Sequence, residues 1–415
     1  MRKLHFIGIG GAGMAPLAAI MLQRGAAVSG SDRERNAKTD RLAAAGATIH
    51  IGHRAEQLPP DAELVVYSSA VASDNPERRE ALRRGIPELR RGEFLARLAA
   101  SYRRTAAVSG SHGKTSVTAM LVHILTRCGR RPGFLIGAAM QDGSPGADAG
   151  RGDDLFITEV DESDGTHTLI HPELGIVPNV DDDHSWSVGG EEALHRNFRT
   201  FAENCRRLLY WGAPLPDLLF TGHPGAVRLD RPAAERPGDR WFGYQKWNAT
   251  LAVRAAVEFG VGEAEAWGAL DTFAGAARRM RVRFESDRLT VVEDYAHHPA
   301  ELAGSLDWLR RRYPGRHLRV LFQPHRYARL EKYLPRFVEE LQKADSAIVT
   351  PVFAAWSETG PVGGRELAAA SGARYLEPPW EGIAAAALEP CPGRALLLAV
   401  IGAGDIEQVF HYLPR

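Results

Sequence analysis

One seven-residue stretch, Gly110-Ser111-His112-Gly113-Lys114-Thr115-Ser116, constrains this chain more than any other feature. Apolar residues typical of a buried strand precede it, and helix-forming residues 117–125 follow it. At such a junction, backbone N–H groups cradle a β-phosphate, the Lys114 ammonium reaches the β and γ oxygens, and the Thr115 hydroxyl can bind Mg²⁺. The alternative is a tight turn that is merely rich in glycine. The context favours a nucleoside triphosphate site, and we assign His112 no chemistry of its own.

A second glycine loop, Gly8-Ile9-Gly10-Gly11-Ala12-Gly13, lies between a predicted strand over 4–9 and a predicted helix over 14–23. It satisfies G-x-G-x-x-G, so helix N-terminal N–H groups can receive a diphosphate. Asp32 ends the next strand, nineteen residues after Gly13, where a dinucleotide enzyme would bind a ribose. A packing turn is the alternative. The hypothesis of an NAD-dependent dehydrogenase would explain this loop but not the other phosphate-binding loop, at 110–116.

Two acidic clusters follow predicted strands over 155–158 and 174–178. They are Glu159-Val160-Asp161-Glu162-Ser163-Asp164 and Asn179-Val180-Asp181-Asp182-Asp183-His184. Because the carboxyl ends of parallel strands meet at one edge of a sheet, both clusters are expected beside the phosphate loop, where carboxylates can hold Mg²⁺. Solvated acidic turns are the alternative. By chemistry alone, His184 is more often a hydrogen-bonding or general-base residue than a magnesium ligand.

A third pair of polar segments lies near the C-terminus. Glu293-Asp294-Tyr295-Ala296-His297-His298-Pro299 follows one strand, and Phe322-Gln323-Pro324-His325-Arg326-Tyr327-Ala328-Arg329 follows the next. Arg326 and Arg329 are three residues apart, so at a helix start both guanidinium groups can clamp a carboxylate or phosphate. Structural histidines and a solvated arginine face are the alternatives. Arg278 and Arg279 precede this region and are further candidates for phosphate contacts.

Alternating strands and helices predict an α/β fold with parallel sheets. The fold is expected to comprise three domains, over 1–98, 99–275 and 276–415. Further strands are predicted over 27–31, 63–68, 105–109, 289–292, 318–322, 347–352 and 395–401. The segment 211–244, rich in Pro and Gly, predicts loops and short strands.

Composition narrows the class of protein. The 415 residues carry 51 Lys and Arg against 51 Asp and Glu, a net charge of +0, so binding to nucleic acid or to an anionic membrane through bulk charge is not expected. Three scattered cysteines indicate neither a disulfide framework nor a zinc site. No apolar run suits a signal peptide or a membrane span, so a cytoplasmic protein is expected.

The combined motifs resemble those of the Mur ligases, in collinear order over nearly the whole chain. The matching segments, beyond the clusters already described, are Gly30-Ser31-Asp32, Ser68-Ser69-Ala70-Val71, Asp74-Asn75-Pro76-Glu77 and Gly402-Ala403-Gly404-Asp405-Ile406. The resemblance implies an N-terminal Rossmann-like domain for a UDP-sugar, a central P-loop ATPase domain and a C-terminal Rossmann-like ligase domain. It also implies an ATP- and Mg²⁺-dependent amide ligase of peptidoglycan precursor synthesis that joins L-alanine to UDP-N-acetylmuramate through an acyl phosphate. The expected assembly is a monomer or a homodimer.

The resemblance assigns roles position by position. Residues matched to ATP binding are Gly110, Ser111, His112, Gly113, Lys114, Thr115, Ser116, Asn248 and Arg279. Residues matched to the UDP-sugar are Gly10, Gly11, Ala12, Gly13, Met14, Ser31, Asp32, Ser68, Ser69 and Ala70. Residues matched to the amino acid and the reacting carboxylate are Tyr295, His297, Arg326 and Arg329. Metal positions match Thr115, Glu159 and His184, and the catalytic set is Lys114, Glu159, His184, His297 and Arg326.

Several residues depart from the family pattern. Tyr244-Gln245 stands where His-Asn is usual, Ser185-Trp186 follows Asp183-His184, and only 134 positions separate Lys114 from Asn248. These departures keep two alternatives open: a murein-peptide recycling ligase, and a family member that binds nucleotide-sugar and ATP without ligating them.

Overall fold

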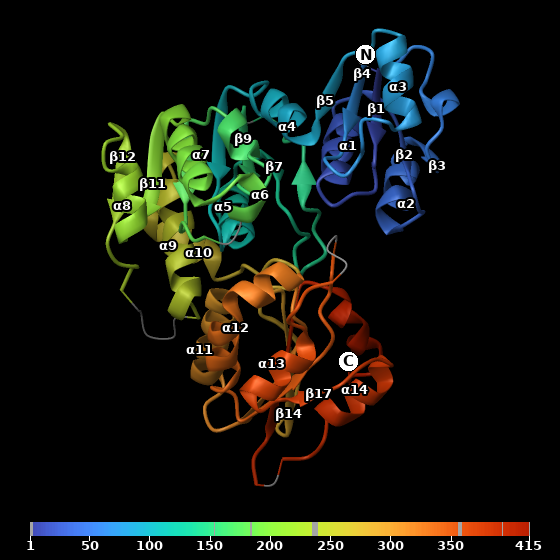
Figure 1. Ribbon diagram of the computed structural model, residues 1–415. Helices are drawn as coiled ribbons and strands as arrows, with labels where there is room; N and C mark the ends of the chain where they lie inside the picture. The colour runs from blue at the N-terminus through green and yellow to red at the C-terminus, as the bar shows by residue number, and fades with distance from the viewer. Residues whose placement is uncertain are drawn as a thin grey trace. The chain divides into compact units, whose positions relative to one another are not determined.

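A computed structural model of the chain describes residues 3–152, 154–182, 185–234, 240–355, 359–391 and 393–414. Three sheets carry the fold (Figure 1). They belong to two compact units: one holds the chain up to Ala234 together with Trp247–Ala274, and the other holds a segment ending at Lys246 together with the chain from Gly275 onward. The predicted α/β class is confirmed, and the domain boundaries proposed from sequence stay predictions.

The N-terminal sheet is five-stranded and fully parallel, in the order β3-β2-β1-β4-β5. Its elements are β1 (Lys3–Ile7), α1 (Met14–Gln23), β2 (Ala27–Asp32), α2 (Ala37–Ala44), β3 (Thr48–Ile51), the 3₁₀ helix η1 (Ala55–Gln57), β4 (Leu64–Tyr67), α3 (Pro76–Arg83), β5 (Glu88–Arg90) and α4 (Arg91–Ala99). The helix predicted over 14–23 is confirmed residue for residue. Strand order reverses between β1 and β4, so the loops that follow these strands flank the crevice where such sheets bind ligands.

The central sheet has seven strands in the order β12-β11-β10-β6-β9-β7-β8, and only β7 and β8 pair antiparallel. Its strands and helices are β6 (Arg104–Val108), α5 (Lys114–Arg127), β7 (Gly133–Leu135), β8 (Ala147–Asp148), β9 (Leu155–Glu159), η2 (Thr166–Leu169), β10 (Leu174–Val177), α6 (Ser185–Val188), α7 (Glu191–Asn204), β11 (Arg207–Trp211), α8 (Pro214–Phe220), β12 (Ala226–Leu229), α9 (Gly243–Glu258) and α10 (Glu263–Leu270). The two strands that carry the acidic clusters, β9 and β10, lie on either side of β6.

The C-terminal sheet has the order β13-β14-β18-β15-β16-β17, with β13 antiparallel to β14. Its elements are β13 (Arg281–Glu285), β14 (Leu289–Asp294), α11 (Pro299–Arg312), β15 (His317–Phe322), α12 (Tyr327–Leu341), β16 (Ser346–Val349), α13 (Gly364–Ser371), β17 (Arg374–Tyr375), α14 (Trp380–Ala387), β18 (Leu396–Ile401) and η3 (Asp405–His411). Figure 1 shows α11, α12 and α13 side by side. Apolar side chains of β14, β15 and β18 fill the core beneath these helices.

The prediction of only loops and short strands over 211–244 is wrong for one part of the segment. Residues 214–220 form α8, which begins with Pro214 at its first position. Proline suits that position because the first N–H of a helix has no intrahelical partner. Pro216, Leu219 and Phe220 are buried and hold the helix against the core. This stabilisation comes from tertiary packing, so a short segment without hydrophobic periodicity does not predict the helix. Residues 235–239 lie outside the described part of the chain.

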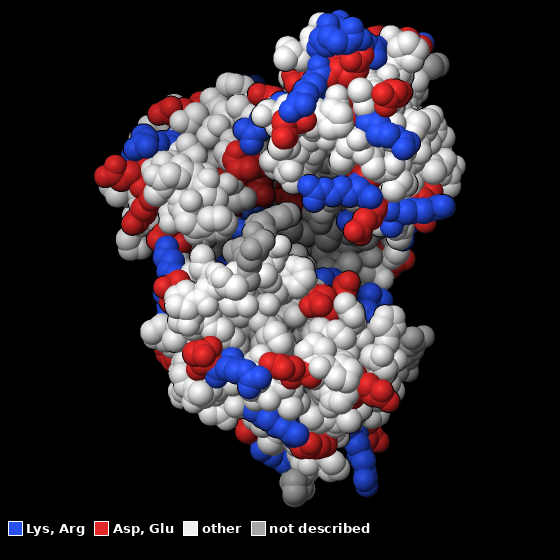
Figure 2. All heavy atoms as spheres, turned by 45° about the vertical axis from the view of Figure 1, so that its right-hand side comes forward, with Lys and Arg blue, Asp and Glu red and all other residues white. Residues whose placement is uncertain are grey.

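The exposed face in Figure 2 carries Lys, Arg, Asp and Glu intermingled. This mixture accords with the net charge of +0, since neither sign of charge dominates that face. Among the described residues, no helix combines the length and the apolar character that crossing a membrane would need.

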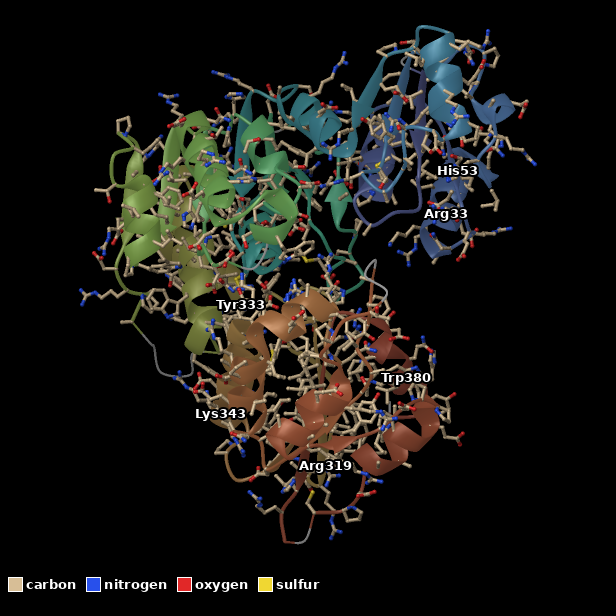
Figure 3. All side chains as sticks on the ribbon, in the orientation of Figure 1. Arg33, His53, Arg319, Tyr333, Lys343 and Trp380 are labelled. Carbon is tan, nitrogen blue, oxygen red and sulfur yellow. The ribbon has the colours of Figure 1, made fainter. Side chains whose placement is uncertain are left out.

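A buried polar network joins the strands of the N-terminal sheet. Glu77 and His5 are fully buried, and Glu77 Oε2 lies 2.6 Å from His5 Nε2. Glu77 Oε1 accepts from Ser31 Oγ at 2.8 Å and from His53 Nδ1 at 2.9 Å. His53, labelled in Figure 3, comes from the loop after β3, and Ser29 Oγ lies 2.8 Å from His5 Nδ1. One carboxylate therefore ties together β1, β2, α3 and the loop after β3.

Hydrogen bonding decides the ionisation of this carboxylate. Burial by itself would raise the pKa of Glu77, but the hydrogen bonds from His5, Ser31 and His53 outweigh burial and lower the pKa below its ordinary 4.5. Because the folded pKa lies below the unfolded one, the network stabilises the fold fully above pH 4.5. That stabilisation is lost as the pH falls through the folded pKa.

We predict that Glu77→Gln lowers the free energy of unfolding by about 3 kcal/mol at neutral pH, because it breaks a buried charged network. Urea denaturation measures the change, which should shrink in acid as the wild-type carboxylate becomes protonated. Glu80→Gln on the same helix removes only a pair with the exposed Arg83 and serves as the control. Equal stability of wild type and Glu77→Gln at neutral pH would contradict the network's role.

Candidate active site

The first glycine loop is held by β2 on one side and touches the loop after β4 on the other. The backbone N–H groups of Gly8 and Ile9 donate to Ser31 O at 2.8 and 3.0 Å. A Cβ on Gly8 would lie 3.2 Å from Ser68 Cβ, so the two loops touch. Ser69 and Ala70 follow as exposed residues, and Ala12 is exposed at the tip of the glycine loop. The predicted UDP-sugar residues therefore surround the reversal point of the sheet.

Three residues of that predicted set face inward. Asp32 Oδ2 accepts from Gly10 N at 2.7 Å, so this carboxylate braces the glycine loop. Ser31 gives its hydroxyl proton to Glu77, and Met14 is buried at the start of α1. The dinucleotide-binding pattern suggests that Asp32 binds a ribose, and this role stays a prediction. The hydrogen bond observed for Asp32 instead holds the backbone of the glycine loop.

The second glycine loop is fastened to the segment after β10. His112 N donates to Asn179 Oδ1 at 2.8 Å, and Asn179 Nδ2 donates back to His112 O at 3.0 Å. Ser111 Oγ donates to Asp181 O at 2.9 Å. Gly110 and Gly113 adopt φ of +146° and +82°, conformations that favour glycine. Hydrogen bonds to the segment after β10 thus set the shape of the loop.

Lys114 begins α5 and extends back over its own loop. Its Nζ donates to Gly110 O and to Glu162 Oε2, both at 2.6 Å. Burial would lower the pKa of Lys114, but the nearby charges of Glu162, Asp161 and Glu159 raise it above its ordinary value. Burial raises the pKa of Glu162 to about 7 in spite of the attraction to Lys114. Three carboxylates around one ammonium leave an excess of negative charge that suits a cation.

Glu159 lies at the end of β9 beside the helix that starts with the phosphate loop. Burial is the main cause that raises its pKa, and hydrogen bonds from the Thr115 side chain and Gly137 N act in the opposite direction. Within the described residues, Glu159 Oε2 is buried and has no hydrogen-bond partner. A buried carboxylate oxygen without a partner, next to a threonine hydroxyl, has the oxygen chemistry that Mg²⁺ prefers. The third predicted metal residue, His184, lies outside the described residues.

Asn248 lies against the phosphate loop. It is 6% exposed on α9, and a Cβ placed on Gly113 would lie 2.8 Å from Asn248 Oδ1. The structure thus brings Asn248 to the loop although 134 positions separate it from Lys114. Ser116, the third residue of α5, is partly buried.

The C-terminal unit gathers its own polar cluster at the ends of β14 and β15. His297 Nδ1 lies 3.0 Å from Tyr295 O and 3.4 Å from Glu301 Oε2, and the His297 and His325 rings are 5.5 Å apart. Arg279 lies over the Tyr295 ring at 5.1 Å. Tyr295 and His297, two of the predicted amino-acid-facing residues, therefore lie together beside the ring of His325.

The two predicted arginines of the clamp differ in their surroundings. Arg326 caps α12 with a φ of +67°, a left-handed conformation that is costly for a side-chain-bearing residue and is frequent at functional sites. Arg329 is 3% exposed, and its Nη1 donates to His325 O at 3.2 Å. Arg329 therefore supports the loop that carries Arg326 and His325.

Sequence reasoning missed three residues that shape the phosphate loop. Glu162 lay inside a recognised cluster but received no role, although it is the carboxylate that holds Lys114. Asn179 likewise opened a recognised cluster without receiving a role, and Gly137 belonged to no motif. Gly137 is required because a Cβ there would lie 1.9 Å from Glu159 Oε1. Only the approach of neighbouring strands reveals such contacts.

Two family models match the chain at its two ends. "Mur ligase family, catalytic domain" covers residues 3–103, and "Mur ligase, glutamate ligase domain" covers residues 278–403. Full-length relatives support the same assignment at 36% identity and above. The chain belongs to the Mur ligase family.

Two of the similar curated proteins illustrate the match, and both are named UDP-N-acetylmuramate–L-alanine ligase. The protein from Anaeromyxobacter sp. is 37% identical, over 97% of this chain and 95% of the relative. The protein from Aquifex aeolicus is 36% identical, over 91% of this chain and 90% of the relative. The solved UDP-N-acetylmuramate-alanine ligase MurC from Thermotoga maritima has the same fold, with a TM-score of 0.81, 24% identity, and coverage of 99% of this chain and 98% of that one.

We predict that Gly113→Ala weakens ADP binding by roughly tenfold or more, because the new Cβ both strains a left-handed backbone and pushes Asn248 from the loop. Gly129→Ala is the matched control: Gly129 follows the same helix, has a φ of +79°, and has nothing within 4 Å of its Cβ position. Calorimetric titration with ADP compares the two variants. Equal affinities would show that the contact with Asn248 has no part in nucleotide binding.

Proposed function

We propose that this chain is an ATP-dependent ligase that joins L-alanine to UDP-N-acetylmuramate and releases ADP and phosphate. The relatives that match nearly its whole length carry this activity in their names. The structural observation that carries the proposal is the position of β6, whose phosphate loop lies between the acidic ends of β9 and β10. A separate glycine loop at the reversal point of the N-terminal sheet supports a second phosphate-bearing substrate.

The reaction needs an activated carboxylate, since a free carboxylate is a poor acyl donor. In the proposed sequence, a lactyl carboxylate oxygen attacks the γ-phosphorus of ATP, the bond to the β,γ-bridging oxygen breaks, and ADP leaves. The amine of alanine then attacks the acyl carbon, loses a proton, and displaces phosphate. Lys114 moves from Glu162 toward the β and γ oxygens, where its charge stabilises the transferring group.

Residues for Mg²⁺ are present among those described. Thr115 and Glu159 would hold the ion, supported by the unpartnered Glu159 oxygen, and His184 is proposed as a further ligand by its place in the family pattern. When bound, Mg²⁺ neutralises charge on the phosphate oxygens. The remaining ATP contacts that we propose are the backbone of Gly110 to Ser116, Asn248, and Arg279.

The amino acid is proposed to bind in the C-terminal unit. Arg326 would hold the alanine carboxylate and so orient the amine, a contribution of proximity. Arg329 fixes the Arg326 loop through His325, and His297 with Tyr295 lines the same cluster. Because every step draws on ATP and a nucleotide-sugar, we propose a cytoplasmic setting.

We predict that Arg326→Ala raises the KM for L-alanine by about 10- to 100-fold, since a charge-assisted pair is lost, and changes the KM for ATP far less. Steady-state ADP release measures both values. Arg336→Ala, on the same helix α12, is the control that removes an arginine outside the cluster. Equal increases in both KM values would contradict a carboxylate-binding role for Arg326.

The function itself is tested by ADP release with UDP-N-acetylmuramate and a panel of acceptors. L-alanine should support turnover, and Lys114→Ala should abolish turnover while UDP-sugar binding remains. Turnover only with the tripeptide L-alanyl-γ-D-glutamyl-meso-diaminopimelate would instead assign a recycling ligase. Binding of both nucleotides without ADP release from any acceptor would overturn the ligase proposal.

A further inference from the structure

Arg91 lies where the first glycine loop meets the acidic loop after β9. It is the first residue of α4, and it forms an ion pair through Nη2 with Asp164 Oδ2. Asp164 is itself held, because its Oδ1 accepts from Thr166 N at 3.0 Å. Thr166 Oγ1 also lies 3.5 Å from Arg91 Nη2. The guanidinium is therefore fixed on one side by an ordered turn of the central sheet.

The other side of the same guanidinium faces Gly13, at the start of α1. A Cβ on Gly13 would lie 2.8 Å from Arg91 Cδ and 3.3 Å from both Nε and Nη1. Any side chain at position 13 would thus displace Arg91, which gives the last glycine of the loop a specific purpose. Gly92 is constrained in the same way, since a Cβ there would lie 2.3 Å from Thr166 Oγ1.

Two positive groups lie together beside the first glycine loop. The N-terminus of α1 carries a partial positive charge, and no acidic residue lies in the first turn of this helix. The Arg91 guanidinium beside it adds a positive group that Asp164 holds from the opposite side, so an anion at the loop would meet both the helix end and the guanidinium. Within the described part of the chain, neither Nε nor Nη1 of Arg91 has a hydrogen-bond partner. Nη2 is taken by Asp164, so Nη1, which lies beside Gly13, is the group placed to donate to a phosphate oxygen at the loop.

We propose that Arg91 binds the diphosphate of the nucleotide-sugar, and that Asp164 positions its guanidinium for this contact. The inference rests on the proposed function, since it assigns a further residue to that substrate. It also links the two substrate regions, because Asp164 belongs to the same acidic segment as Glu162, the residue that holds Lys114. Arg91 is the substrate-binding group, and Asp164 is a positioning residue that acts through it.

Binding of UDP and uridine, measured by calorimetry without ATP or amino acid, isolates the contact. Arg91→Gln should weaken UDP binding by about 10- to 100-fold and leave uridine binding unchanged, because only the diphosphate loses its charged partner. Arg91→Lys should fall between wild type and Arg91→Gln, since it keeps the charge and loses the planar guanidinium that can contact Asp164 and a phosphate at once. Arg90→Gln, which alters the adjacent and exposed arginine, is the control.

A second variant keeps the inference testable if Arg91→Gln proves unstable in a thermal unfolding measurement. Asp164→Asn leaves Arg91 in place but loosens it, so it should weaken UDP binding by a smaller factor and raise the KM for UDP-N-acetylmuramate without changing the KM for ATP. Unchanged ratios of UDP to uridine affinity in both variants would overturn the inference, and so would equal losses for UDP and uridine. Wild-type protein that binds UDP but releases no ADP would contradict only the proposed function.

Discussion

The parallel pairing of β6 with both β9 and β10 is the constraint on which the central site depends. Parallel strands end at the same edge, so this one arrangement brings the glycine loop, Glu159 and the segment from Asn179 to Asp181 together. Hydrogen bonds between His112 and Asn179, and between Ser111 and Asp181, then set the loop's shape. Without the crossover order of this sheet, the same residues would be three unrelated polar turns.

The two glycine loops differ in the charged groups that surround them. Lys114 is surrounded by Glu162, Asp161 and Glu159, and their combined charge exceeds its own. At the N-terminal loop, Arg91 adds to the positive end of α1, while the carboxylate of Asp164 pairs with its guanidinium and the carboxylate of Asp32 accepts from Gly10 N. A net charge of +0 therefore averages over an acidic cluster at one loop and a mixture of both signs at the other.

Much of the fold was predictable because local signals and tertiary structure agree. The helix at Met14–Gln23 and the strands that precede both glycine loops have the expected apolar patterns and the expected positions. Agreement failed at 214–220, where a helix depends on burial of Phe220 rather than on periodicity. The same is true of the candidate site. A sequence motif predicted Lys114 and Thr115 as site residues, whereas the roles of Glu162 and Gly137 depend on contacts between segments that are far apart in sequence.

The sequence by itself determined which chemical groups are available to this protein. These groups are two glycine loops that precede helices, the positively charged side chains of arginines and Lys114, and carboxylates at the ends of strands. Those features depend on residues adjacent in the chain, so local geometry suffices to read them. Only the tertiary structure decided which groups act on one another. It turned Asp32 onto Gly10, buried Glu77 between two histidines, and placed Arg91 between Gly13 and Asp164. Such pairings arise because packing a sheet brings together side chains whose separation in sequence carries no signal.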